Sequence, residues 1–210
     1  MKFRPVDFDA IIFDLGGVIL NLDYNKTIAA FESLGMKNFQ EYYAQAQQDA
    51  VFDNYETGSI TSDEFRAYFR ETIDSNLSDS AIDNAWNEML LDLPSHRIEL
   101  LKNIKDQTRI YLFSNTNAIH LEAFKNIIQD AYGNANLLEE TFLETYYSHI
   151  VGERKPNAAA FNKVLRDHQL QPEKVLFVDD SEQHIIGAKN IGINAYHLVN
   201  EDISQIFDLN

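Results

Sequence analysis

Side chains able to bind a metal and an anion stand directly after three short apolar runs of this sequence. The groups are Asp14-Leu15-Gly16-Gly17, Ser114-Asn115-Thr116-Asn117 and Asp179-Asp180. Two adjacent carboxylates at the end of a buried strand repel each other and lose hydration, and a bound cation relieves both penalties. Glycines allow a sharp turn that brings backbone N–H groups close to an anion. The three groups therefore favour metal-assisted chemistry on an anionic substrate.

A lysine stands between the second and third groups, in Gly152-Glu153-Arg154-Lys155-Pro156, ahead of a helix expected to start near Pro156. Each group alone has a plain structural explanation: a strand end, a turn, a helix cap or a surface lysine. Parallel α/β sheets, however, bind ligands beyond the carboxyl ends of their strands. Parts of one site at three separate strand ends are harder to explain by structure alone.

The elements that would position these groups are visible in the spacing of apolar residues. Short runs rich in β-branched and aromatic residues predict strands, and helical patterns separate the last four of them. This alternation predicts an α/β fold, a three-layer Rossmann-like core with a parallel sheet. The expected strands are 10–13, 110–113, 175–178, 195–198 and, more weakly, 147–151, and the expected helices are 118–131, 158–168 and 184–191.

The segment from Tyr24 to Leu91 has a different character, with helical periodicity and no convincing strand. Thr61-Ser62-Asp63-Glu64 is a capping box, in which Thr and Glu satisfy the free N–H groups at a helix start. Pro94 marks the return to the α/β pattern. We expect an all-helical insert at residues 23–92, within a core formed by residues 1–22 and 93–210.

Composition narrows the possible partners. The 210 residues include 33 Asp and Glu against 17 Lys and Arg, a net charge of −16, which disfavours binding to nucleic acid and to anionic membranes. The absence of cysteine excludes disulfides, thiolate zinc sites and a cysteine nucleophile. The apolar run 10–13 is too short for a signal peptide or a membrane span. We expect a cytoplasmic protein that acts on a small metabolite, with its oligomeric state left open.

The ordered motifs resemble those of the haloacid dehalogenase superfamily of phosphohydrolases. Asp14, Ser114, Lys155 and Asp179-Asp180 occupy its four motif positions in order, and the resemblance covers essentially the whole chain. The helical insert resembles the small cap domain of that family. The motif residues, with His120, resemble a bacterial subgroup that includes a glucose-1-phosphate phosphatase and is similar to the N-terminal phosphatase domain of epoxide hydrolases.

The resemblance implies a Mg²⁺-dependent hydrolase of small phosphate monoesters that acts through an aspartyl-phosphate intermediate, and we expect its substrates to be sugar phosphates. It implies catalytic roles for Asp14 as nucleophile, Ser114 and Lys155. It implies that Mg²⁺ is held by Asp14, the backbone carbonyl of Gly16, Asp179 and Asp180. It implies substrate binding by Asn115, Gly17 and His120.

One position departs from the family pattern, because Gly16 stands where most phosphatases of the family carry a second Asp that protonates the leaving group. A sugar 1-phosphate, with its better leaving group, would tolerate this loss, and His120 or Asp23 are candidate proton donors. Packing explains His120 equally, and a helix N-cap explains Asp23. The alternatives are a 2-haloacid dehalogenase-type hydrolase, against which Asp179-Asp180 argues, and a catalytically weak protein that binds a ligand or partner.

Smaller features carry smaller expectations. His184 stands where similar family members often carry Asn, and we expect a local difference at a helix start, or else a substrate contact. Residues 55–60 resemble a cap loop that faces the active site in related folds, although a turn before Thr61 explains them too. Most aromatic residues of the insert are expected in its core, with one or two lining a pocket.

Overall fold

The core of the protein is a parallel sheet of five strands in the order β5-β4-β1-β6-β7. The computed structural model describes residues 2–44, 47, 48, 50–73 and 75–209. Every neighbouring pair of strands in this sheet is parallel. The strands are β1 (Ala10–Phe13), β4 (Arg109–Ser114), β5 (Glu144–Tyr147), β6 (Val175–Asp179) and β7 (Asn194–His197).

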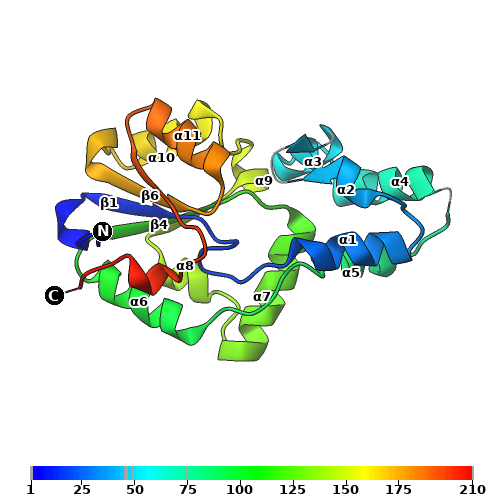
Figure 1. Cartoon of the computed structure of the whole chain (residues 1–210), viewed down its shortest axis with the longest axis horizontal. Coiled ribbons are helices and arrows are strands. Elements are labelled where there is room, and N and C mark those ends of the chain that lie inside the picture. The colour runs from blue at the N-terminus through cyan, green and yellow to red at the C-terminus, as the bar shows by residue number, and fades with distance from the viewer. Residues whose placement is uncertain (1, 45–46, 49, 74, 210) are drawn as a thin grey trace.

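Helices cover both faces of this sheet, which gives the three layers expected from the sequence (Figure 1). Ile11 and Phe13 of β1 pack on one side, while Ala10 and Ile12 pack on the other. This alternation buries both faces, so the central strands are apolar throughout. The first side is covered by α6 (Ser95–Lys105), α7 (Ala118–Tyr132) and α8 (Leu137–Thr141), and the second by α10 (Ala158–Asp167) and α11 (Glu182–Asn190).

The strand expected at residues 147–151 is wrong, because the strand of this region lies earlier in the sequence. β5 ends at Tyr147, and Ser148–Val151 forms the short helix α9. Gly152 closes that helix in the left-handed conformation, with its N–H donating to the carbonyl oxygen of Ser148 at 2.8 Å. The apolar residues after Tyr147 therefore belong to a helical turn. Three short 3-10 helices complete the core: η1 (Pro5–Asp7), η2 (Pro172–Lys174) and η3 (Ile203–Gln205).

A second group of helices lies beside the carboxyl edge of the sheet, and we call it the cap (Figure 1). The capping box predicted at its fourth helix is present, since the N–H of Glu64 donates to Thr61 Oγ1 at 3.2 Å and the N–H of Thr61 donates to Glu64 Oε2 at 2.8 Å. The cap helices are α1 (Tyr24–Ser33), α2 (Phe39–Tyr42), α3 (Ala50–Glu56), α4 (Ser62–Ile73) and α5 (Asp79–Asn87).

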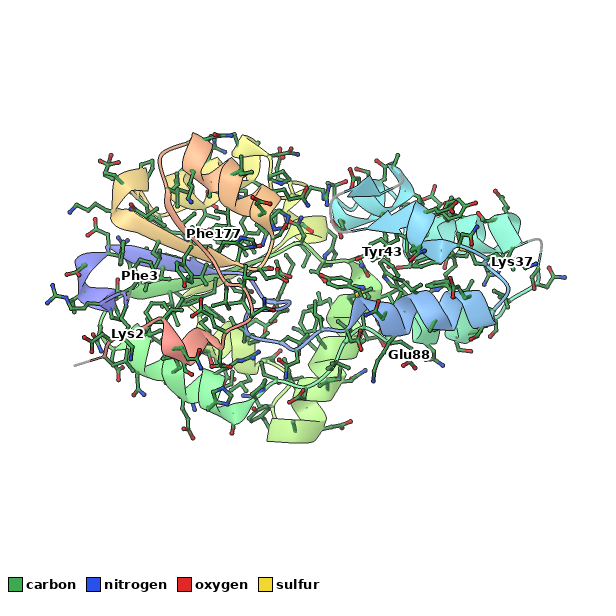
Figure 2. All side chains as sticks on the ribbon, viewed as in Figure 1. Lys2, Phe3, Lys37, Tyr43, Glu88 and Phe177 are labelled. Carbon is green, nitrogen blue, oxygen red and sulfur yellow. The ribbon has the colours of Figure 1, made fainter. Side chains whose placement is uncertain are left out.

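The cap departs from the all-helical expectation at one place, where β2 (Tyr43–Ala44) and β3 (Gln47–Gln48) form a short antiparallel ladder. Strands of two residues are too short to show an alternating pattern in a sequence. The cap has its own core of stacked aromatic side chains, separate from the two cores around the sheet. Figure 2 shows Tyr43 in the cap and Phe177 in the sheet core.

Two linkers, residues 20–23 and 89–92, join the cap to the sheet domain and lie antiparallel to each other; we call them the linker ribbon. The backbone N–H of Asn21 donates to the carbonyl oxygen of Asp92 at 2.9 Å, and the two side chains bond again at 2.9 Å. The cap boundaries proposed from the sequence, at residues 23 and 92, fall in this ribbon. Within the described part of the chain, no helix is long and apolar enough to cross a membrane.

Candidate active site

Asp14 lies where β1 ends, with its carboxylate at the edge of the sheet that faces the cap. The backbone N–H of Asp14 donates to the carbonyl oxygen of Val178 at 2.9 Å, which extends the β1–β6 pairing and aligns Asp14 with the end of β6. The chain then turns at Gly17, whose φ of 71° lies in the left-handed region. A Cβ at Gly17 would collide with the carboxylate of Asp180. Glycine is therefore required both by the turn and by the approach of Asp180.

Lys155 links the ends of two strands. Its Nζ lies 2.8 Å from Asp14 Oδ1 and donates to Asp179 Oδ2 at 2.6 Å, and the side chain is fully buried. The loop that carries it is held by Asn115, whose Nδ2 donates to the Lys155 carbonyl at 2.8 Å and whose Oδ1 accepts from the Lys155 N–H at 2.9 Å. Asn115, expected to bind substrate, is thus engaged in holding Lys155 in place while also lining the pocket.

The two adjacent carboxylates of the third group differ in their partners. Asp179 accepts from Lys155, from the N–H of Ser181 at 2.8 Å, and lies 3.0 Å from His184 Nδ1. Burial alone would raise the pKa of Asp179, but Lys155 and His184 hold that pKa well below its usual range. Burial, followed by the charges of Asp14 and Asp179, raises the pKa of Asp180 to about 7. The charge of Lys155 opposes this rise only in part, and among the described residues no cation forms an ion pair with Asp180.

The charges around Asp14 fit a divalent cation. Burial raises the pKa of Asp14, while Lys155 opposes that rise; burial would lower the pKa of Lys155, but Asp14 and Asp179 raise it. Two carboxylates, Asp14 and Asp179, contact one lysine, and Asp180 adds a third carboxylate nearby, which leaves an excess of negative charge. Oxygen ligands of this kind suit Mg²⁺. Ligand atoms of Asp14, Asp179 and His184 also lie within 4.8 Å of one another, near enough for one ion.

His184 belongs to the site more directly than its sequence position suggests. It lies in the first turn of α11, and its Nδ1 is 3.0 Å from Asp179 Oδ1, with Nε2 3.5 Å from Asn115 Nδ2. The signal available in the sequence was its spacing from Asp179. Five residues place a side chain one helical turn beyond a strand end, where it can point back to that end.

The remaining expected residues lie around the same pocket. Ser114 ends β4, is buried and lines the pocket. His120 also lines it, but the ring stacks on Trp86 at 4.7 Å and Nδ1 lies 2.8 Å from Asn87 Oδ1. Burial lowers the pKa of His120 to about 3, so the ring is neutral and is no source of an acidic proton. Asp23 accepts from the N–H of Asn25 as the N-cap of α1, in agreement with its structural explanation.

The pocket is closed by both halves of the protein. The sheet domain contributes the polar groups, while the cap and the linkers contribute a mixed wall. Two aromatic side chains of the cap, Tyr24 and Tyr43, line the pocket, in agreement with the expected one or two, and most of the others pack in the cap core. The cap and linker residues of the wall are Leu20, Leu22, Tyr24, Tyr43, Glu56, Met89 and Leu90.

A model of the haloacid dehalogenase-like hydrolase family matches residues 8–192. The chain belongs to this family. The match spans β1, the cap and the sheet through α11, so it includes every group described above. It confirms the resemblance found in the sequence and the expectation of an enzyme, a hydrolase of the haloacid dehalogenase type.

Relatives of this family agree with the expectation of a phosphatase. A D-ribitol-5-phosphate phosphatase from Bacteroides thetaiotaomicron is 26% identical over 186 residues, 89% of either chain. A haloacid dehalogenase (HAD) family enzyme from the same organism has been solved in complex with magnesium and inorganic phosphate. It is 35% identical and superimposes with a TM-score of 0.88 over 96% of this chain and 99% of that one. An L-2-haloacid dehalogenase from Xanthobacter autotrophicus shares the fold, at 19% identity and a TM-score of 0.59 over 94% and 80%.

Gly16 shows what replaces the second Asp of the family's phosphatases. A Cβ at Gly16 would lie 2.5 Å from Cδ1 of Leu22, so a linker side chain occupies the space that a side chain at position 16 would need. Leu22 also lines the pocket. The space that a carboxylate at position 16 would need is therefore taken by an apolar side chain.

Proposed function

We propose that this protein hydrolyses small sugar or polyol phosphate monoesters with Mg²⁺, using Asp14 as the nucleophile. The observation that carries the proposal is the position of the Asp14 carboxylate, in a pocket and 2.8 Å from a buried lysine. The D-ribitol-5-phosphate phosphatase relative supports a polyol or sugar phosphate as the substrate class. The magnesium and phosphate complex of the 35% identical enzyme supports the metal.

In this mechanism Asp14 attacks phosphorus, the P–O bond to the leaving group breaks as the aspartyl-phosphate forms, and the leaving oxygen takes a proton from water to depart as the alcohol. A second water then attacks the aspartyl-phosphate, which releases phosphate and restores the carboxylate. Lys155 lowers the repulsion between the carboxylate and the phosphate. The hydroxyl of Ser114 donates to a phosphoryl oxygen. Mg²⁺, held by Asp14, Asp180 and the carbonyl of Gly16, with Asp179 in its surroundings, would supply the remaining neutralisation.

The cap contributes by shielding this reaction from bulk water. Its residues line the pocket opposite Asp14, and closure strengthens the interactions of Lys155 with the transferring group. Cap opening then releases the alcohol and the phosphate. A sugar 1-phosphate, with a good leaving group, is one member of this substrate class that would tolerate Gly16. Ribitol 5-phosphate, a primary alkyl phosphate, would test whether a good leaving group is required.

The dehalogenase alternative receives less support. A 2-haloacid carries a carboxylate, and Asp180, which lines the same pocket as Asp14 and interacts with its charge, would repel it. The dehalogenase neighbour shares the fold at 19% identity, which says nothing about its reaction in this chain.

The experiment is phosphate release from sugar phosphates, polyol phosphates, nucleotides and p-nitrophenyl phosphate, with Mg²⁺ and with EDTA. We expect release that requires metal and a drop on the order of a thousandfold or more in Asp14→Asn, because the nucleophile is gone. Circular dichroism of the variant controls for folding. Wild-type turnover by Asp14→Asn would refute the nucleophile assignment. Halide release from 2-haloacids, without phosphate release from any ester, would refute the proposed phosphatase activity and support a dehalogenase.

A further inference from the structure

The wall of the pocket contains an ion pair between the cap and the sheet domain. Arg154, the residue before Lys155, donates from Nε to Glu56 Oε2 at 2.9 Å, and its Nη1 lies 2.7 Å from Asp53 Oδ1. Glu56 ends α3, 98 residues away in the sequence. The Glu56 and Arg154 side chains are 12% and 16% exposed, and both line the pocket. The remaining exposure of this pair therefore opens in part to the pocket.

The position of Glu56 relative to the sheet domain is fixed by backbone packing close by. Gly58 has a φ of +68°, and a Cβ there would collide with the carbonyl oxygen of His149 in α9. The cap backbone therefore approaches the sheet domain as closely as a glycine permits. Glu56, two residues earlier, is held at a set distance from Arg154 by this contact.

Two polar atoms of the pair remain for a ligand. Within the described residues, the bonds of Glu56 use Oε2 and those of Arg154 use Nε and Nη1. Glu56 Oε1, an acceptor, and Arg154 Nη2, a donor, are left over. A hydroxyl group can donate to the first and accept from the second. An adjacent acceptor and donor of this kind match two neighbouring hydroxyls of a polyhydroxy alcohol.

The charge of the pair opposes a second anionic group on the substrate. Arg154 is shared between two carboxylates, Glu56 and Asp53, so the formal charges of the cluster are one positive and two negative. Lys155 is likewise shared between Asp14 and Asp179. A carboxylate on the leaving alcohol would find both of these cations already paired and Glu56 close by.

We infer that the Glu56–Arg154 pair determines specificity for the leaving alcohol, selecting phosphate monoesters of neutral polyhydroxy alcohols over esters whose alcohol carries a carboxylate. This inference rests on the proposed phosphatase function and adds the residues that recognise the alcohol. Glu56 accepts from one hydroxyl and Arg154 donates to its neighbour, while the phosphate lies at Asp14.

The test compares kcat/KM for ribitol 5-phosphate and 2-phosphoglycolate in the wild type and in Glu56→Gln. The wild type should prefer ribitol 5-phosphate. Glu56→Gln loses the charged acceptor for a substrate hydroxyl and the negative charge that repels the glycolate carboxylate. The ratio of the two kcat/KM values should therefore fall about tenfold or more. Glu56→Asp, which keeps the charge but shortens the reach, should lower kcat/KM for ribitol 5-phosphate without improving that for 2-phosphoglycolate.

Asp83→Asn is the matched control, because Asp83 forms a partly buried ion pair with Arg66 in the cap at 2.8 Å but is not among the residues that line the pocket. It should leave the preference within about twofold of wild type, a margin well below the effect of one charged hydrogen bond. An unchanged preference in Glu56→Gln, or an equal change in Asp83→Asn, would overturn the inference while leaving the phosphatase in place. Absence of phosphate release from every ester by the wild type would instead refute the proposed function, and this inference with it.

Discussion

Lys155→Met tests whether the buried charge of Lys155 stabilises the carboxylates of the site. The variant keeps a long side chain in the buried space but removes the ammonium group that lies 2.8 Å from Asp14 and 2.6 Å from Asp179. Each contact has a Coulomb energy of about 6 kcal/mol at an effective dielectric constant near 20, largely offset by the cost of burying the charges. Removing one partner from such a buried pair costs about 3–5 kcal/mol. We expect a loss of that size in the free energy of unfolding at pH 8 in EDTA.

The pH dependence of this loss has a defined sign. Without Lys155, the pKa of Asp14, which burial already raises, rises further, and the pKa of Asp179 loses the lysine that helps to hold it low, so the folded variant takes up protons at higher pH than the wild type does. Stability from a raised pKa is present at low pH and is lost as the pH rises through the folded pKa. The deficit of Lys155→Met should therefore shrink on acidification, by up to about 1.4 kcal/mol per pH unit for each carboxyl group.

Urea unfolding followed by circular dichroism, at pH 8 and pH 5, measures both quantities. Lys163→Met is the matched control, because Lys163 is 37% exposed and forms a surface pair with Asp167 at 3.0 Å. It should change the free energy of unfolding by about 0.5 kcal/mol or less. A loss below about 1 kcal/mol for Lys155→Met at pH 8, below the range for a broken buried ion pair, or a deficit that grows at pH 5, would refute the reasoning.

Two further substitutions probe local geometry. Gly17→Ala forces a Cβ against the Asp180 carboxylate at a left-handed position, so we expect the Mg²⁺ concentration for half-maximal phosphate release to rise about tenfold, with an unchanged requirement contradicting the role of Asp180. Thr61→Ala removes the capping bonds to Glu64 at the start of α4, and urea unfolding should show a loss of about 1 kcal/mol. A Thr61→Ala protein as stable as wild type would mean that the capping box contributes nothing in this cap.

The sequence predicts the sheet well because its central strands are buried on both faces. The run at 10–13 coincides with β1, and 175–178 lies within β6, which extends one residue further. The edge strand β5 is half exposed at its start, so Glu144 and Thr145 carry no apolar signal and the strand was placed too late. Local pattern thus locates elements that are apolar throughout and misplaces those that are only partly buried.

The site is predictable only where its residues follow strand ends. Asp14 and Asp179 occupy such positions, and the parallel sheet brings them to one edge. The Glu56–Arg154 pair joins positions 98 residues apart, and its existence depends on how the cap sits on the sheet domain. No local spacing encodes that placement. The same holds for Leu22, which fills the space beside Gly16 from the linker.

The linker ribbon sets the kind of motion available to the cap. The two linker segments are hydrogen-bonded to each other. Sliding or twisting of the cap would break these backbone hydrogen bonds, whereas bending of the ribbon keeps them. Bending of the ribbon is thus the cap motion that breaks the fewest hydrogen bonds. Leu22 and Leu90 face each other as a bridge in this ribbon, and both line the pocket. Opening of the cap and reshaping of the pocket wall beside Asp14 are therefore a single movement.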